Sequence, residues 1–338
     1  MKKLLALTLV LCLILSVGVS AFAAPKKVTL SLGLTSAAED LATQSFERFA
    51  KNVEEKSDGS IVINVFPASQ LGDAVAQMES MITGAQDMFA EGELNYEADH
   101  GVPELKAQSY GCVNTNEKLR TFLASSVYKE WNEKFRQVNG VVTIANNWIR
   151  TPVVMALREP LTTMEQFKGV KLRTVPSEST ITAYSALGFN PTAVAYNEVY
   201  LSLSQGVIDG TICPFEGAYS MKFYEQAPYI LKVGTAVTNN ALWVNEAKWN
   251  SLTDEQRAII TECAVEAGDW YSEQIQETIK EYVAAMEAGG ATIIEPSEEL
   301  LQQVDEALGK AAQQSIADGK LDGDAYQKMH DAALGLID

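Results

Sequence analysis

Apolar positions between residues 28 and 90 follow two alternating periods. A period of two, typical of strands, marks the first apolar stretch, and a run of β-branched residues marks another. A period near 3.6, typical of helices, separates them, with Phe46, Phe49 and Val53 on one helical face. The expected elements are a strand over 28–34, a helix over 41–56, a strand over 61–66, a helix over 73–82 and a short strand over 87–90. This order predicts a mainly parallel sheet with helices on its faces.

The same alternation begins again further along the chain. A helix over 116–138 and a strand over 141–146 complete the first set of elements. The second set comprises strands over 153–157, 171–174 and 210–213 and helices over 177–187 and 198–205. We therefore expect two α/β lobes, whose binding crevice lies at the carboxyl ends of strands.

A long helical pattern follows over residues 253–289. Thr253 and Gln256 form a capping-box sequence at its start, and Gly289 marks its end. A helix of roughly 35 residues measures about 50 Å, which is long enough to brace two lobes. Two further helices are expected within 297–336. We assign residues 24–147 plus 236–275 to lobe I and residues 148–235 plus 276–338 to lobe II.

The first 23 residues have the pattern of an export signal. Lys2 and Lys3 precede an apolar run, and Ala21-Phe22-Ala23 is a small-residue cleavage site. We expect cleavage after Ala23 and a periplasmic location, with an uncleaved membrane anchor as the alternative.

Composition narrows the range of functions. The 338 residues carry 26 Lys and Arg against 44 Asp and Glu, a net charge of −18 without a basic run, so no nucleic-acid partner is expected. The cysteines at 112, 213 and 263 match no disulfide or metal spacing, and we interpret them as small apolar residues or pocket lining.

Sequence motifs of catalysis are missing. The chain lacks the phosphate-loop, dinucleotide-binding and serine-nucleophile patterns, so we expect neither an enzyme nor a cofactor. The acidic residues between Glu91 and His100 match no metal-site spacing, and we interpret them as a solvated loop, with no metal expected. A secreted hydrolase that uses paired carboxylates remains the alternative from another class.

Arg173 is the residue that most clearly suggests a ligand. It lies at the end of an expected strand, directly before a helix, where α/β lobes bind ligands. The arginine fork suits a carboxylate. On spacing alone, a surface arginine is an equal alternative.

Six short motifs, in order along the chain, carry a resemblance to a known family. They are Phe66–Gly72, Gly84–Met88, Phe167–Arg173, Gly188–Pro191 with Asn197–Tyr200, Gln205–Gly210 and Trp249–Leu252. Together they resemble the solute-binding proteins of TRAP (tripartite ATP-independent periplasmic) transporters.

The resemblance implies a two-lobed periplasmic binding protein fold with a long helix crossing both lobes. Its cleft would close on an organic acid. The protein, as a monomer, would then deliver this acid to TRAP membrane subunits. The same fold could instead serve a signalling partner as a ligand sensor. The arginine that pairs with the ligand carboxylate in this family falls on Arg173. Sugar acids, dicarboxylates, keto acids and aromatic acids all remain open as ligands.

Further site residues follow from the resemblance. Arg150 is similar to a second ligand-binding arginine of some members, with a surface or hinge arginine as the alternative. Tyr196 is at the position of a stacking aromatic, with a plain core residue as the alternative. Ile212 and Cys213 stand where many members carry a polar ligand-binding residue. An apolar side chain at 212 cannot ligate a cation, which argues against a metal-assisted site.

Five other residues complete the expected site. Trp148 and Phe215 add apolar surface, which favours a ligand with an apolar or aromatic body, although Trp148 is equally suited to the core. Glu91, Asp73 and Asn240 lie near strand ends or crossings of the first lobe, and we expect them to reach ligand hydroxyls.

Overall fold

The computed structural model describes residues 27–338, so the expected signal peptide and its cleavage site after Ala23 lie outside the described residues. From residue 27 onward, no helix combines the length and the apolar character that crossing a membrane requires.

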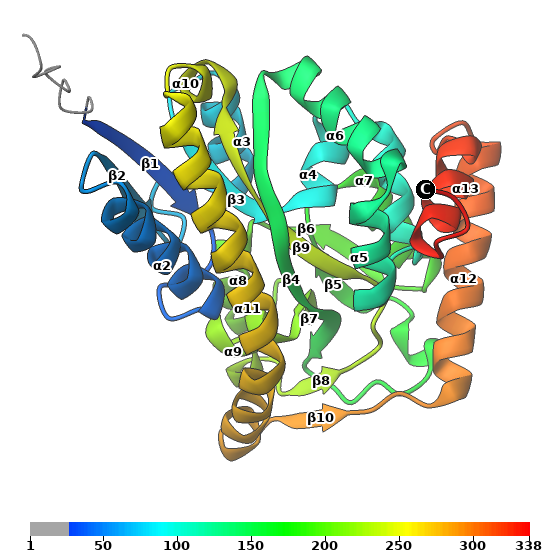
Figure 1. Cartoon of the computed structure of the whole chain (residues 1–338). Helices are drawn as coiled ribbons and strands as arrows, with labels where there is room; N and C mark the ends of the chain where they lie inside the picture. Colours follow the sequence, from blue (N-terminus) through cyan, green and yellow to red (C-terminus); the bar gives the residue numbers. More distant parts are fainter. Residues whose placement is uncertain (1–26) are drawn as a thin grey trace, which may run out of the picture.

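Within residues 27–338, ten strands form one continuous sheet in the order β2-β1-β3-β9-β4-β7-β5-β6, with β8 and β10 attached beside β4 (Figure 1). The strands are β1 Val28–Leu34, β2 Ile61–Phe66, β3 Met88–Gly92, β4 Val141–Leu157, β5 Lys171–Thr174, β6 Asn190–Ala193, β7 Gly210–Pro214, β8 Tyr229–Leu231, β9 Val237–Asn245 and β10 Thr292–Ile294. The parallel pairing expected of the first strands is confirmed, because β1 runs parallel to both β2 and β3. At the centre, β9 and β4 run antiparallel to their neighbours.

Strand β4 links the two halves of the sheet. Its first part pairs with β9 as far as Pro152, and its last five residues pair with β7. The sequence predicted two separate strands here, which is wrong. Polar residues around Asn146 and Asn147 interrupt the apolar pattern, but the backbone stays paired through register shifts between 143 and 152.

Helices cover both faces of the sheet (Figure 1). They are α2 Leu41–Lys56, α3 Ala74–Ile82, α4 Glu93–Asp99, α5 Asn116–Ala124, α6 Ser126–Asn139, α7 Glu178–Ala186, α8 Val199–Ser204, α9 Phe215–Ser220, α10 Glu246–Asn250, α11 Asp254–Ala288, α12 Glu298–Ala317 and α13 Gly323–Ala333, with short 3-10 helices η1 Pro103–Tyr110, η2 Met164–Phe167, η3 Tyr196–Glu198 and η4 Phe223–Glu225. Buried apolar residues form one core beneath α2, α9 and α11 and a second beneath α5, α6, α12 and α13.

The single helix predicted over 116–138 is wrong, since the structure has two. Ser125 has an extended backbone (φ −69°, ψ 160°), which ends α5. Its side-chain hydroxyl then accepts a hydrogen bond from the Tyr128 backbone N–H and so caps α6. A serine that caps a helix outweighs an apolar pattern that runs through it.

The long helix α11 is confirmed, and it begins at the predicted capping box. The Thr253 hydroxyl accepts from the Gln256 backbone, and the Gln256 side chain accepts from the Thr253 backbone. Figure 1 shows α11 in yellow, running along the height of the molecule. It packs on both α2 and β4 and so connects the two halves of the sheet.

Candidate functional site

One cavity of about 110 Å³ lies between the two halves of the sheet, where β3, β5 and β7 end. A void for one water takes roughly 10–15 Å³, and a cavity near 150 Å³ accepts benzene, so the space suits several waters or a small organic molecule. Its lining comprises Glu91, Gly92, Tyr96, Gln108, Ser109, Arg150, Val153, Arg173, Val175, Thr180, Tyr184, Tyr196, Ile212, Cys213, Pro214, Thr235, Ala236 and Thr238. Among the residues predicted to bind the ligand, Glu91, Arg150, Arg173, Tyr196 and Cys213 are therefore brought together here.

Arg173 lies in β5 with its side chain buried. Its Nε donates to the Val194 carbonyl at 2.8 Å, and its guanidinium lies 5.4 Å from the centre of the Tyr196 ring. Burial lowers the pKa of Arg173 from its ordinary value, yet an arginine remains charged. Within residues 27–338, no carboxylate lies within ion-pair distance of it. In the described part of the chain, a buried cation without an ion-pair partner thus faces the cavity.

Arg150 is buried as well, so the alternative interpretation of Arg150 as a surface arginine is wrong. Its Nε donates to Glu216 Oε1 at 2.8 Å, and both side chains are almost fully buried. Burial opposes the charge of Arg150, but the Glu216 carboxylate holds the pKa of Arg150 well above its ordinary value. The Nη2 atom has no hydrogen-bond partner in the described part of the chain. Arg150 therefore brings a balanced charge and one free donor to the cavity.

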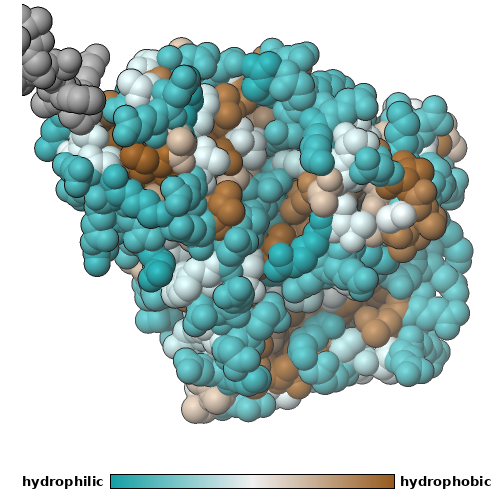
Figure 2. All heavy atoms as spheres, in the orientation of Figure 1, coloured by the Kyte–Doolittle hydropathy of each residue, from teal (hydrophilic) through white to brown (hydrophobic). Residues whose placement is uncertain are grey.

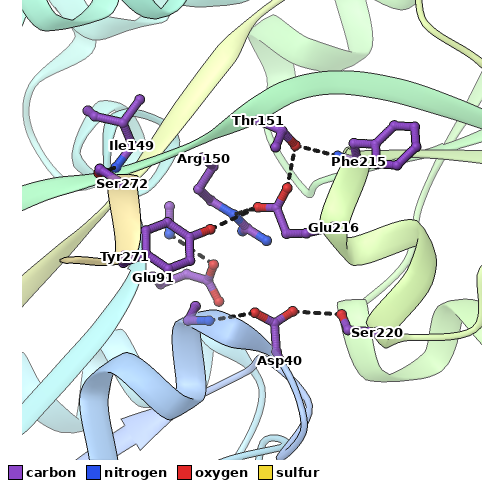
Figure 3. A network of polar contacts seen from close by, with 12 residues as sticks. Asp40, Glu91, Ile149, Arg150, Thr151, Phe215, Glu216, Ser220, Tyr271 and Ser272 are labelled. Carbon is purple, nitrogen blue, oxygen red and sulfur yellow. Dashed lines mark hydrogen bonds and ion pairs between the residues drawn. The ribbon is translucent and has the colours of Figure 1, made fainter. Parts of the chain in front are cut away.

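Glu216 organises the polar network behind Arg150 (Figure 3). The Tyr271 hydroxyl of α11 donates to Glu216 Oε1 at 3.1 Å, and the Thr151 hydroxyl donates to Oε2. Thr151 in turn accepts from the Phe215 backbone N–H at 2.7 Å. This network joins β4, α9 and α11 and fixes the position of the Arg150 guanidinium.

Tyr196 lines the cavity and also packs against the core. Its ring meets Phe223 edge-on, with 5.5 Å between the ring centres. Its buried hydroxyl has no partner among residues 27–338, and burial raises the pKa of Tyr196 well above its ordinary value. The tyrosine is therefore a protonated donor beside the two arginines.

Glu91 and Cys213 complete the predicted residues that reach the cavity. The Gly92 backbone N–H donates to Glu91 Oε1 at 2.9 Å, and the Thr35 hydroxyl donates to Oε2. Burial raises the pKa of the Cys213 thiol to about 12, so it stays protonated at neutral pH. It acts as pocket lining rather than as a nucleophile.

Three predicted residues lie outside the cavity lining. The Trp148 ring is fully buried, stacks on Phe46 at 4.6 Å and donates through Nε1 to Ser45 Oγ at 2.7 Å. Asp73 is exposed and caps α3 by accepting from the Ala76 N–H. Asn240 is buried in β9.

The expectation that Trp148 and Phe215 add apolar surface to the pocket is therefore wrong, since neither residue lines the cavity. Phe215 is buried in the same apolar core as Trp148. The register shifts of β4 break the regular alternation of faces, so sequence spacing does not place Trp148 relative to Arg150. The observed lining carries seven hydroxyl side chains, three of which belong to tyrosines.

Sequence reasoning missed the polar wall formed by η1 and α7. The Tyr184 hydroxyl lies 2.6 Å from that of Thr235, and Ser109 Oγ lies 3.0 Å from Ser179 Oγ. Thr180 and Tyr184 are four residues apart on α7 and so share one helical face, a signal available in the sequence. The sequence contains no comparable spacing that would have indicated Gln108 or Tyr96.

The solvated acidic loop predicted after Glu91 is also wrong. Glu93 and Glu97 are fully buried, because α4 begins at Glu93 and turns both side chains inward. Tyr128 and Asn239 donate to Glu93, while Asn132 and Trp243 donate to Glu97 at 3.1 and 3.3 Å. Burial raises the pKa of Glu93 to about 7 and that of Glu97 well above its ordinary value.

Comparison of the sequence with known families matches residues 32–318 to bacterial extracellular solute-binding protein family 7. The sialic acid-binding periplasmic protein SiaP of Vibrio cholerae is 26% identical over 295 residues, which are 85% of this chain and 89% of that protein. The 2,3-diketo-L-gulonate-binding periplasmic protein YiaO of Escherichia coli is 26% identical over 282 residues, which are 82% of this chain and 84% of that protein.

Comparison of folds agrees with the sequence match. The crystal structure of the sugar acid binding protein DctPAm from Advenella mimigardefordensis, in complex with galactonate, superposes with a TM-score of 0.86. The identity is 18%, and the match covers 92% of this chain and 99% of that one. The two-lobed α/β fold expected from the motifs is thereby confirmed. The chain belongs to bacterial extracellular solute-binding protein family 7, the solute-binding proteins of TRAP transporters that its motifs resemble.

Proposed function

We propose that the protein captures a small organic acid in the cavity between its halves, with Arg173 binding the ligand carboxylate. The observation that carries the proposal is a buried guanidinium that lines a cavity and, within residues 27–338, pairs with no carboxylate. An uncompensated buried charge is costly, so an anion bound there gains more than one bound at the surface. The planar fork of arginine allows two parallel hydrogen bonds to a carboxylate.

Arg150 and Tyr196 would hold a second group of the ligand. The Nη2 atom of Arg150 and the hydroxyl of Tyr196 are both buried and lack partners in the described chain. Both are donors, so they suit a ligand hydroxyl, carbonyl or second carboxylate oxygen. The names of three similar proteins supply compatible ligands, since sialic acid, 2,3-diketo-L-gulonate and galactonate all combine a carboxylate with hydroxyl groups.

The wider role follows from the family. The protein would be exported after cleavage at Ala23, act in the periplasm as a monomer without enzymatic activity, and deliver its acid to TRAP membrane subunits. Its two lobes would comprise residues 24–147 plus 236–275 and residues 148–235 plus 276–338. The first would carry Glu91, and the second would carry both arginines.

A thermal-shift screen tests the proposal. A ligand that binds only the folded state raises the melting temperature. We expect carboxylates such as D-galactonate, D-gluconate or L-malate to raise it, while the uncharged polyol galactitol leaves it unchanged. A panel in which galactitol shifts the protein as much as the acids do would contradict carboxylate recognition.

A further inference from the structure

We propose that Glu91 makes the site select hydroxylated monocarboxylates and reject dicarboxylates. This inference rests on the proposed function, because it takes the first ligand carboxylate to be bound by Arg173. It narrows the ligand to acids that carry hydroxyl donors and no second negative charge.

Few charged side chains line the cavity. Among the residues that line it, Glu91, Arg150 and Arg173 are the ones with a full charge. The charge of Arg150 is already balanced, since Glu216 lies 2.8 Å from its Nε and both side chains are buried. Arg173 is therefore the cation of the lining that has no ion-pair partner among residues 27–338, although the charge of Glu91 acts on it from a longer distance. One ligand carboxylate can pair with Arg173, whereas a second would meet the negative charge of Glu91 without a free cation of its own.

Two hydrogen bonds hold the Glu91 carboxylate in place. Its Oε1 accepts from the Gly92 N–H and its Oε2 from the Thr35 hydroxyl, so the carboxylate is fixed by donors on both oxygens. Figure 3 shows Glu91 on the side of the Arg150 guanidinium away from Thr151. Each carboxylate oxygen can accept a further hydrogen bond, which a ligand hydroxyl supplies and a ligand carboxylate cannot.

The cavity is small and has a polar wall. Within about 110 Å³, a second ligand carboxylate could not move far from Glu91, and like charges at close range inside a protein repel strongly. Arg150 offers a free Nη2 donor but no unbalanced charge to offset that repulsion. The polar wall adds the hydroxyls of Ser109, Thr180 and Tyr184, which pair readily with ligand hydroxyls.

Two pairs of sugar acids provide a matched test. D-Galactonate and galactarate, like D-gluconate and D-glucarate, differ only at the terminal carbon, which is a hydroxymethyl group in one and a carboxylate in the other. We would measure their dissociation constants by calorimetry at pH 7.5. We expect the wild-type protein to bind at least one monocarboxylate, and to bind its dicarboxylate partner at least about tenfold more weakly.

Glu91→Gln removes the charge and keeps the shape of the side chain. We expect it to reduce the preference for the monocarboxylate by about tenfold, mainly by tightening dicarboxylate binding. Glu130→Gln is the matched control, since it makes the same substitution at an exposed position of α6 that is not part of the cavity lining. This control should leave the preference unchanged.

The inference is overturned if the wild-type protein binds no monocarboxylate of the pairs, if it binds the dicarboxylate as tightly, or if Glu91→Gln leaves the ratio unchanged. The wild-type comparison requires no variant and stands even if Glu91→Gln does not fold. Arg173→Ala separates the two proposals. If Arg173→Ala binds neither acid of a pair, while the wild-type protein binds both acids equally well, only the role of Glu91 fails. If it keeps wild-type affinity, the proposed carboxylate anchor fails first.

Discussion

At the scale of single residues, the proposed anchor Arg173 gives the most direct prediction. Removing one partner of a buried charge pair costs about 2–5 kcal/mol, so Arg173→Ala should weaken acid binding by roughly 30-fold or more. Arg173→Lys keeps the charge but loses the planar fork, and should recover only part of the affinity. Calorimetry with the acid that binds most tightly in the screen measures both variants.

Arg48→Ala provides the control for that experiment. Arg48 is an exposed residue of α2, with its guanidinium 5.4 Å from the centre of the Trp270 ring. Its loss should leave acid affinity within about threefold of the wild-type value, a difference below 1 kcal/mol. Arg173→Ala binding within the same limit would show that the carboxylate is held elsewhere.

The buried carboxyl of Glu93 predicts a dependence of stability on pH. Burial raises its pKa from 4.5 to about 7, so between these values the folded state holds more protons than the unfolded state. The free energy of unfolding should therefore fall as the pH rises through this window, by roughly 1–3 kcal/mol between pH 5 and pH 8. Urea denaturation at several pH values measures the fall.

Glu93→Gln should flatten this pH profile, because the side chain can no longer ionise. Some fall should remain, since burial also raises the pKa of Glu97 and of Asp40. Glu130→Gln, at an exposed position of α6, should keep the full fall. A wild-type protein that is equally stable or more stable at pH 8 would contradict the argument.

Residue-scale prediction from the sequence succeeded where a motif fixed the position. Arg173 lies near the end of β5, and Tyr196 lies at the start of η3, just before α8. Both residues line the cavity. It failed for Trp148, because irregular pairing in β4 decides which way that side chain faces. Glu216 was missed because its role depends on a partner 66 residues away, which spacing does not reveal.

At the scale of elements, local signals were sufficient for helices with clear caps. Strand β1 and helix α2 have the predicted bounds, and α11 follows its capping box. The wrong predictions concern places where polar residues stand within or between apolar stretches of the sequence. Ser125 divides one apolar pattern into two helices, while β4 continues through two asparagines because pairing with β9 holds it extended.

The close approach of α11 to β4 gives a prediction for this scale. A Cβ at Gly268 would lie 2.2 Å from Asn147 Oδ1, and the Asn147 amide donates to Val265 and Asp269. Gly268→Ala should therefore displace Asn147 and lower the free energy of unfolding by about 1 kcal/mol, despite the better helix propensity of Ala.

Gly309→Ala in α12 is the matched control. An added Cβ there meets no atom within 4 Å. The substitution should stabilise the protein by about 0.5–1 kcal/mol, as expected for a helical glycine without a packing role. Chemical denaturation compares the two variants. Equal stabilisation by both would show that α11 and β4 are not held at the observed distance.

At the scale of the whole molecule, contacts between distant segments hold the two halves around the cavity. Asp40 caps α2 beside the first half of the sheet, and its Oδ2 accepts from the Ser220 hydroxyl at the end of α9 at 2.6 Å (Figure 3). Both side chains are buried. Much of the face seen in Figure 2, in contrast, is hydrophilic. Buried polar contacts such as this one therefore help to hold the two halves around the cavity.

Such contacts are expected to form when two lobes close and to break when they open. X-ray scattering should accordingly show a smaller radius of gyration when the protein is saturated with its acid than when it is free. An unchanged radius at saturation would contradict closure.

Ser220→Ala tests whether the bond to Asp40 contributes to closure. Ligand affinity includes the free energy of reaching the closed state, so a less stable closed state binds more weakly. A typical hydrogen bond contributes about 0.5–1.5 kcal/mol, and losing it should weaken binding by up to about tenfold without altering any cavity residue. Ser204→Ala is the control, because the Ser204 hydroxyl donates to Leu201 within its own exposed helix turn. Ser220→Ala should still show a smaller radius of gyration at saturation, but it should need a higher concentration of acid to reach saturation. If Ser220→Ala and Ser204→Ala bind equally well, the contact between α2 and α9 does not contribute to holding the lobes together.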